Sequence, residues 1–215
     1  MNIKKDGLHN YLLDKQIDRL DEKVAEIEYK KGYEIYSPSK RYTAIYEIVE
    51  GAIKLGSVSP SGIEIMHEIL VQGEFFGNLR LLDDNAGLFG NLKGLHKPFS
   101  EFSKTLVPTL VRCYEYDFFK HLITNDPNVA EWFYEKIVSR WCKTESLFIS
   151  VLSLPPRERI QLVYQFYDTK IKVRPNKETL LNTIISFKDM ANLTGTTRQL
   201  VAITLQSIQN EVPLS

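Results

Sequence analysis

The sequence predicts an α+β fold: an antiparallel β-roll of the jelly-roll (double-stranded β-helix) type, then one long helix, then a C-terminal helix-turn-helix domain. Three observations predict it. Short β-rich segments punctuated by glycines fill residues 33–77, a pattern typical of antiparallel sandwiches and rolls. A helical apolar pattern follows Pro127, and two short helical segments flank Gly195 near the end of the chain.

The N-terminal part of the chain combines a helical segment with the strands of the predicted roll. Residues 8–27 place apolar side chains at helical spacing, so we expect a helix there. Residues 82–98 contain four glycines or prolines, which predicts a loop, and residues 106–116 return to strand character. The strands expected between these segments are 33–36, 44–49, 52–55 and 63–70.

Pro127 opens a helix that we expect to run to about Leu152. One stripe on it steps by 4, 4, 3, 4 and 3 positions, as in a heptad pattern. The stripe carries more aromatic surface than a small neighbouring sheet normally covers, which predicts a homodimer interface. Packing against the chain's own β domain is the alternative. The stripe consists of Phe133, Ile137, Trp141, Thr144, Phe148 and Val151.

A break over residues 154–156 (LPP) ends this helix, because proline removes a backbone donor and restricts the preceding residue. A further helix is expected over residues 157–167, and residues 170–177 are expected to form a basic loop. The inward residues of the further helix are Ile160, Val163, Phe166 and Tyr167.

Residues 186–208 predict two short helices joined by a tight turn. Ser186 and Thr196 each precede an acidic or amide residue by three positions, the spacing of a capping box. Gly195 lies between the helices, where a residue tolerant of positive φ is needed. The second helix has apolar residues at i, i+4 and i+7, which are Val201, Leu205 and Ile208.

The polar face of that second helix suits the major groove of double-stranded DNA, where a recognition helix presents its N-terminal side chains to base edges. Arginine binds guanine bidentately and glutamine binds adenine, while threonine hydroxyls and first-turn amides suit phosphate. A helical hairpin that only packs is the alternative. The candidate DNA-contacting residues are Lys188, Thr196, Thr197, Arg198, Gln199, Ala202, Ile203 and Gln206.

Composition and charge fit this arrangement. The 215 residues are 43% apolar, which suits one large or two small domains. Charge balances over the whole chain, but residues 153–215 hold 8 Lys and Arg against 5 Asp and Glu, and the remainder holds 19 against 22. A mildly basic C-terminal part on an acidic body fits a DNA-binding module beside a domain with another role.

The cysteines and histidines predict neither a metal site nor an enzyme. Cys113 and Cys142 are distant in sequence, and the four histidines are scattered without a triad, dyad or metal-ligand spacing. No apolar run is long enough for a membrane span, and no apolar core of a secretory signal follows Met1. We therefore expect a cytoplasmic, non-enzymatic protein with no metal and no membrane partner.

Five segments, in this order and spacing, resemble motifs of the Crp/Fnr family of bacterial transcription regulators. They are KGYEI at 31–35, EGAIK at 50–54, GEFFG at 73–77, PRERI at 156–160 and GTTRQ at 195–199. The resemblance covers about residues 8–211. It implies a cyclic-nucleotide-binding-like β-roll sensor domain over residues 1–126, a dimerisation helix over 127–154 and a helix-turn-helix DNA-binding domain over 155–215.

The sequence also departs from the family pattern. Cyclic-nucleotide-binding members carry Gly-Glu-Leu where this chain has Gly77-Asn78-Leu79, and an arginine some ten residues on, whereas no arginine occurs between Leu81 and Val111. We expect no cofactor and no binding of cyclic AMP, and the effector stays undefined. The candidate residues of this degenerate pocket are Gly77, Asn78, Leu79, Arg80, Ser100, Ser103 and Lys104.

Two departures concern DNA. Ile203 stands where the family often has an arginine, and the chain stops at Ser215, so we expect the β-hairpin wing to be reduced or absent. The resemblance implies a homodimeric regulator of a near-palindromic duplex site, with RNA polymerase as a further candidate partner. The alternative is a β-roll module that binds a ligand or partner and whose DNA head is decayed.

Overall fold

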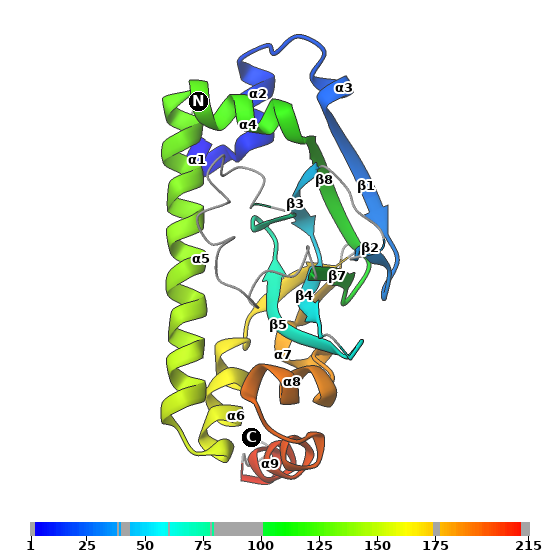
Figure 1. Ribbon diagram of the computed structural model, residues 1–215, viewed down its shortest axis with the longest axis vertical. Helices are drawn as coiled ribbons and strands as arrows, with labels where there is room; N and C mark the ends of the chain where they lie inside the picture. Colours follow the sequence, from blue (N-terminus) through cyan, green and yellow to red (C-terminus); the bar gives the residue numbers. More distant parts are fainter. Residues whose placement is uncertain are drawn as a thin grey trace.

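Two antiparallel four-stranded sheets form the β-roll. One has the order β1 (Val24–Tyr29), β8 (Thr109–Glu115), β3 (Ala44–Glu50), β6 (Phe75–Gly77); the other has β2 (Glu34–Tyr36), β7 (Glu101–Thr105), β4 (Ala52–Val58), β5 (Glu64–Val71). Strands one and eight, two and seven, three and six, and four and five are therefore neighbours, the pairing of a jelly roll. The predicted fold class is confirmed (Figure 1).

The structure is a computed structural model that describes residues 3–37, 39, 44–59, 61–77, 79, 101–173 and 177–211, without the side chains of residues 6 and 209–211. The predicted loop at 82–98 lies outside these residues. Within them, no helix combines the length and hydropathy that crossing a bilayer requires.

The core between the two sheets consists of the inward residues of alternating strand positions. Tyr46 stacks on Phe76 with ring centroids 4.9 Å apart, and Val111 belongs to the same buried cluster. Gly51 turns β3 into β4 at φ +101°, and a Cβ there would lie 2.6 Å from Thr109 Oγ1. This turn therefore requires glycine both for its backbone conformation and for the close approach of β8.

The helix predicted over residues 8–27 was wrong in its second half. The chain forms α1 (Ile3–Asp6), α2 (Leu8–Asp14) and α3 (Leu20–Lys23), and then enters β1. Gln16 and Arg19 have φ of 51° and 53°, in the left-handed region that a continuous right-handed helix cannot contain. Residues 24–29 pair with β8, so tertiary pairing overrides the local helical pattern.

The strand predicted over residues 106–116 is also corrected. β7 ends at Thr105, β8 begins at Thr109, and a helix that the sequence analysis missed, α4 (Tyr116–Asn125), follows directly. Phe119 and Leu122 are its buried residues, and their three-residue spacing was the available signal.

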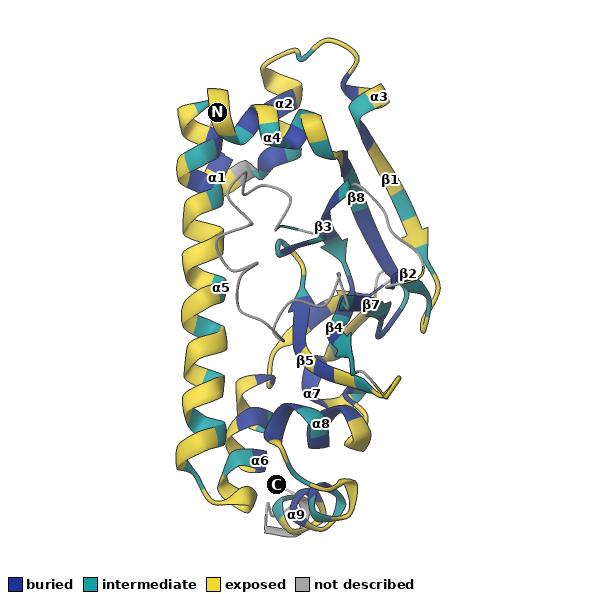
Figure 2. Cartoon of the chain, viewed as in Figure 1, coloured by how far each residue is buried: buried dark blue, intermediate teal, exposed yellow. Residues whose placement is uncertain are grey.

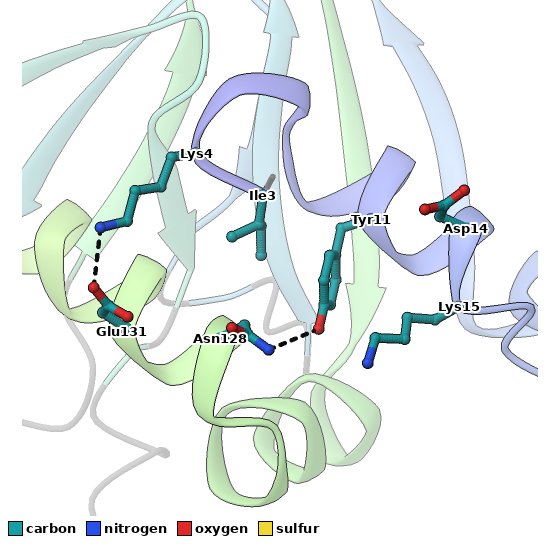
Figure 3. A pocket seen from close by; sticks show the side chains of 7 residues that line it. All are labelled: Ile3, Lys4, Tyr11, Asp14, Lys15, Asn128 and Glu131. Carbon is teal, nitrogen blue, oxygen red and sulfur yellow. Dashed lines mark hydrogen bonds and ion pairs between the residues drawn. The ribbon is translucent and has the colours of Figure 1, made fainter. Parts of the chain in front are cut away.

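The long helix α5 (Pro127–Ser153) runs along one side of the whole molecule (Figure 1). Asp126 caps it by accepting a hydrogen bond from the Asn128 amide, with Pro127 at the first helical position. Tyr11 donates to Asp126 and Lys4 pairs with Glu131, so the N-terminal helices close over the start of α5 around an open hollow (Figure 3).

The C-terminal head begins at the predicted break and comprises α6 (Pro156–Phe166), β9 (Lys170–Val173), β10 (Lys177–Leu180), α7 (Leu181–Ile184), α8 (Phe187–Thr194) and α9 (Arg198–Glu211). The predicted basic loop at 170–177 is instead the antiparallel hairpin β9–β10. Ile160, Val163 and Tyr167 are buried as predicted, but Phe166 is 43% exposed. The inner face of α6 is therefore the face that carries Ile160 and Val163, and Phe166 lies outside that face.

The head is docked on the β-roll of its own chain. One continuous apolar cluster joins Met66 and Ile69 of β5 to residues of α6, α8 and α9. Lys54 Nζ lies 2.8 Å from the buried Asp189 carboxylate of α8, and the Gly51 amide donates to the Lys172 carbonyl at 2.8 Å. The helix break at residue 154 therefore does not separate two independent cores.

Candidate nucleic-acid interface

The two helices α8 and α9 form the predicted helix-turn-helix. Ser186 Oγ accepts from the Asp189 amide at 3.1 Å, which confirms the predicted cap of α8. The cap of α9 was assigned one residue too early. Thr197 Oγ1 accepts from the Leu200 amide at 3.2 Å, whereas the Thr196 hydroxyl lies 2.8 Å from the Thr194 hydroxyl.

The turn between the helices depends on Gly195, which adopts the left-handed conformation with φ 58°, as expected. The Thr196 amide donates to the Ala191 carbonyl at 3.0 Å and closes the end of α8. Arg159 of α6 donates to the Thr194 carbonyl at 3.1 Å. The turn is thus fixed to the first helix of the head as well as to α8.

Helix α9 buries one face and exposes the other. Val201, Thr204 and Leu205 are buried, and Ile208 packs on the same cluster. Arg198, Gln199 and Gln206 are exposed, and Ile203 is 46% exposed between them. The predicted inward and outward faces are therefore those observed. Of the other candidates, Thr197 and Lys188 are exposed, while Thr196 and Ala202 are half-buried.

The exposed face of α9 is polar but weakly charged. Arg198 carries the only positive charge in its sequence, at the N-terminal end where the helix dipole and free amides also favour anions. Figure 1 shows α9 at the end of the molecule furthest from the N-terminal helices.

Of the residues predicted for the β-roll pocket, the structure describes Gly77, Leu79, Ser103 and Lys104. Asn78, Arg80 and Ser100 lie outside the described residues. Ser103 and Lys104 are adjacent on β7, so their side chains point to opposite faces of the sheet. Lys104 is held by Glu34 and Glu64.

The other described pocket candidates are Gly77 and Leu79, and Ser103 adds a buried hydroxyl. Leu79 is half-buried against the N-terminal apolar cluster. Gly77 has φ 123°, and a Cβ at this position would lie 2.6 Å from the Ala44 carbonyl oxygen. Ser103 Oγ is fully buried and has no hydrogen-bond partner among the described residues.

Charged side chains between the roll and α5 already satisfy one another. Arg140 binds the Glu68 carboxylate through two nitrogens at 2.9 and 2.6 Å, and Lys143 Nζ lies 3.1 Å from Glu74. Burial opposes the charge of Arg140, yet its hydrogen bonds to Glu68 hold the pKa of the guanidinium above the ordinary value. Burial and the neighbouring Glu101 carboxylate raise the pKa of Tyr36 well above its usual range.

Three described cations of this region are therefore already paired. Lys104, Arg140 and Lys143 each bind a carboxylate, whereas an anion such as a cyclic phosphate needs a cation that is not already paired. These ion pairs were not foreseen, because their partners are distant in sequence. No group of three or more His, Cys, Asp or Glu residues within the described ranges is placed to hold a metal ion.

The stripe predicted on α5 divides between two environments. Phe133 packs into the chain's own core, with its ring centroid 5.3 Å from that of Phe119. Trp141 and Phe148 are 69% and 62% exposed. Thr144, Phe148 and Val151 line a cavity of about 300 Å³ between α5, β5 and α8. The exposed apolar surface is therefore shifted by one position from the predicted stripe, and Ile137 lies at its edge.

Solved structures share this arrangement. A cyclic nucleotide-binding domain containing protein from Listeria monocytogenes EGD-e matches with a TM-score of 0.65 at 15% identity, over 97% of this chain and 91% of that one. FixK2 from Bradyrhizobium japonicum matches at 0.65 and 16% identity, over 87% and 85% of the two chains. A transcriptional regulator of the CRP family from Thermus thermophilus matches at 0.63 and 16%, over 86% and 85%.

The chain has the Crp/Fnr fold. This confirms the fold that the five motifs implied. No protein-family model matches the sequence, and no curated protein does. At identities of 15–16%, these similarities establish the fold alone.

Proposed function

We propose that this chain is a homodimeric DNA-binding transcription regulator that reads a near-palindromic duplex site through α9. The observation that carries the proposal is the exposed polar face of α9, with Arg198 and Gln199 at its N-terminal end. A recognition helix uses these positions to contact base edges. Because this face holds few charges, we expect specificity to rest on few base contacts.

The exposed apolar residues of α5 support the homodimer. Two copies packed through this helix would present their α9 helices about one turn of DNA apart, roughly 34 Å, which implies two half-sites. A contact with RNA polymerase is part of the same proposal and rests on the family resemblance alone.

Selection from a random duplex library with the full chain tests this function, followed by fluorescence anisotropy on the selected site. The triple variant Arg198→Ala, Gln199→Ala, Gln206→Ala should lose the preference for that site. A matched control removes the same residue types from exposed positions of α6: Arg157→Ala, Gln161→Ala and Gln165→Ala. Failure to select any sequence would favour the β-roll module with a decayed DNA head.

A further inference from the structure

A stripe of exposed and mostly apolar residues runs along α5, a helix that Figure 2 shows as largely exposed over its length. Its members step by 4, 3, 4, 3 and 4 positions, the spacing of a two-stranded coiled coil. Five of the six positions are apolar or aromatic and between 38% and 70% exposed. The stripe comprises Tyr134, Val138, Trp141, Glu145, Phe148 and Leu152.

Glu145 is the exception, and it lies in the middle of the stripe. It is four residues after Trp141 and three before Phe148, so an apolar residue is expected there. The side chain is exposed and makes no hydrogen bond or ion pair with any described residue.

The cations of α5, a helix described throughout, lie on its other side. Arg140 binds Glu68 and Lys143 binds Glu74, both on the chain's own roll. Lys136 lies over the ring of Trp132, 6.0 Å from its centroid. A second copy of α5 packed on the stripe therefore brings no lysine or arginine of its own to Glu145.

We propose that the two Glu145 carboxylates face each other across the axis of the homodimer and keep the dimer weak. This inference rests on the homodimer in the proposed function. In a parallel two-stranded coil, residues at core positions meet their own counterparts, and a polar residue at one such position fixes register at a cost in stability. Like charges held in an apolar seam repel strongly because little water screens them.

A weak dimer changes how DNA is bound. A duplex with two half-sites binds both subunits next to each other, and this raises the effective concentration at which the two α5 helices associate. Binding to such a site should then depend more steeply than first order on protein concentration, because two monomers assemble on the DNA. Removal of the charge should restore a preformed dimer and a first-order dependence.

The experiment is sedimentation equilibrium of the full chain with the variants Glu145→Gln and Glu145→Leu. The first should lower the dimer dissociation constant about tenfold, which corresponds to about 1.4 kcal/mol, and the second should lower it further. Glu135→Gln is the control, because it removes the same charge from an α5 residue that pairs with Lys4. Rising salt should tighten the wild-type dimer and leave the Glu145→Gln dimer unchanged.

Two results would overturn the proposal, and they differ in whether the homodimer is also excluded. A wild-type dimer that Glu145→Gln leaves unchanged or weakens would show that the two carboxylates do not repel each other across the axis, so the inference fails while the homodimer stands. A chain that stays monomeric with leucine at position 145 would remove the α5 interface and the inference together.

Discussion

At the scale of single residues, DNA recognition depends on very few side chains. Arg198 carries the only positive charge of α9, and Ile203 interrupts its polar face. Lys188 is exposed on α8 and suits a phosphate rather than a base edge. The two cations should therefore contribute differently to affinity and to specificity.

Arg198→Ala is expected to weaken binding to the selected site by about 1–3 kcal/mol and to relax the choice at one base pair per half-site. Lys188→Ala should weaken binding evenly across sequences and reduce the salt dependence by about one counterion. Anisotropy titrations on specific and random duplexes at several salt concentrations measure both effects. Equal losses on both duplexes for Arg198→Ala would assign that residue to phosphate.

Cyclic AMP should not bind to the β-roll. Cyclic-nucleotide-binding members of the family use a glutamate and an arginine that this chain lacks. Each hydrogen bond to a charged group contributes on the order of 1.5–3 kcal/mol, so the loss of both contacts should lower the affinity for cyclic AMP by several powers of ten. The nearby cations Lys104, Arg140 and Lys143 are already paired with carboxylates. Isothermal titration calorimetry should show no saturable heat. Micromolar binding that disappears in Lys136→Ala would instead identify that lysine as the phosphate ligand.

At the scale of elements, local sequence patterns correctly predicted the segments in which tertiary packing favours the same secondary structure as the pattern. The glycine-punctuated strands, the helix from Pro127, the cap of α8 and the turn at Gly195 depend on residues close in sequence, and these were recognisable, whereas the cap of α9 was assigned one residue too early. The helix expected over residues 8–27 was wrong because pairing with β8 draws its second half into a strand. The face of α5 was misjudged because Phe133 packs on α4, an element that the sequence analysis had missed.

Trp141→Glu should convert the dimer into monomers, because it places a second charge one turn from Glu145 in an apolar seam. The residue is 69% exposed in the single chain, so the fold itself should be unaffected. Sedimentation velocity measures the change. Phe187→Glu is the control, since it charges another exposed aromatic residue, on α8. An unchanged dimer in Trp141→Glu would exclude α5 as the interface.

At the scale of the whole molecule, the head and the β-roll form one packed body. The link is the apolar cluster together with the ion pair between Lys54 and Asp189, in which the Asp189 side chain is 7% exposed and that of Lys54 is 21% exposed. None of these contacts was predictable, because each joins residues that are distant in the sequence. The sequence pattern of each element indicated its apolar face, but not which other element would pack against that face.

Lys54→Met should lower the free energy of unfolding by on the order of 2 kcal/mol, because it leaves the Asp189 carboxylate buried without its cation. The loss falls below the about 3–5 kcal/mol of a fully buried pair, since Lys54 keeps some access to water. Urea denaturation measures it. Lys23→Met breaks the exposed pair with Glu115 and should cost less than about 1 kcal/mol. Equal effects would mean that the interdomain pair is no stronger than a surface contact.

The docked head also has a thermal consequence. Any motion that lifts the head from the roll exposes Met66, Ile69 and Met190 to water, and newly exposed apolar surface raises the heat capacity. Burial of surface against DNA lowers it. The temperature dependence of the binding enthalpy therefore reports motion: a positive contribution to the heat capacity indicates that the head leaves the roll, and its absence indicates that α9 binds DNA where it lies.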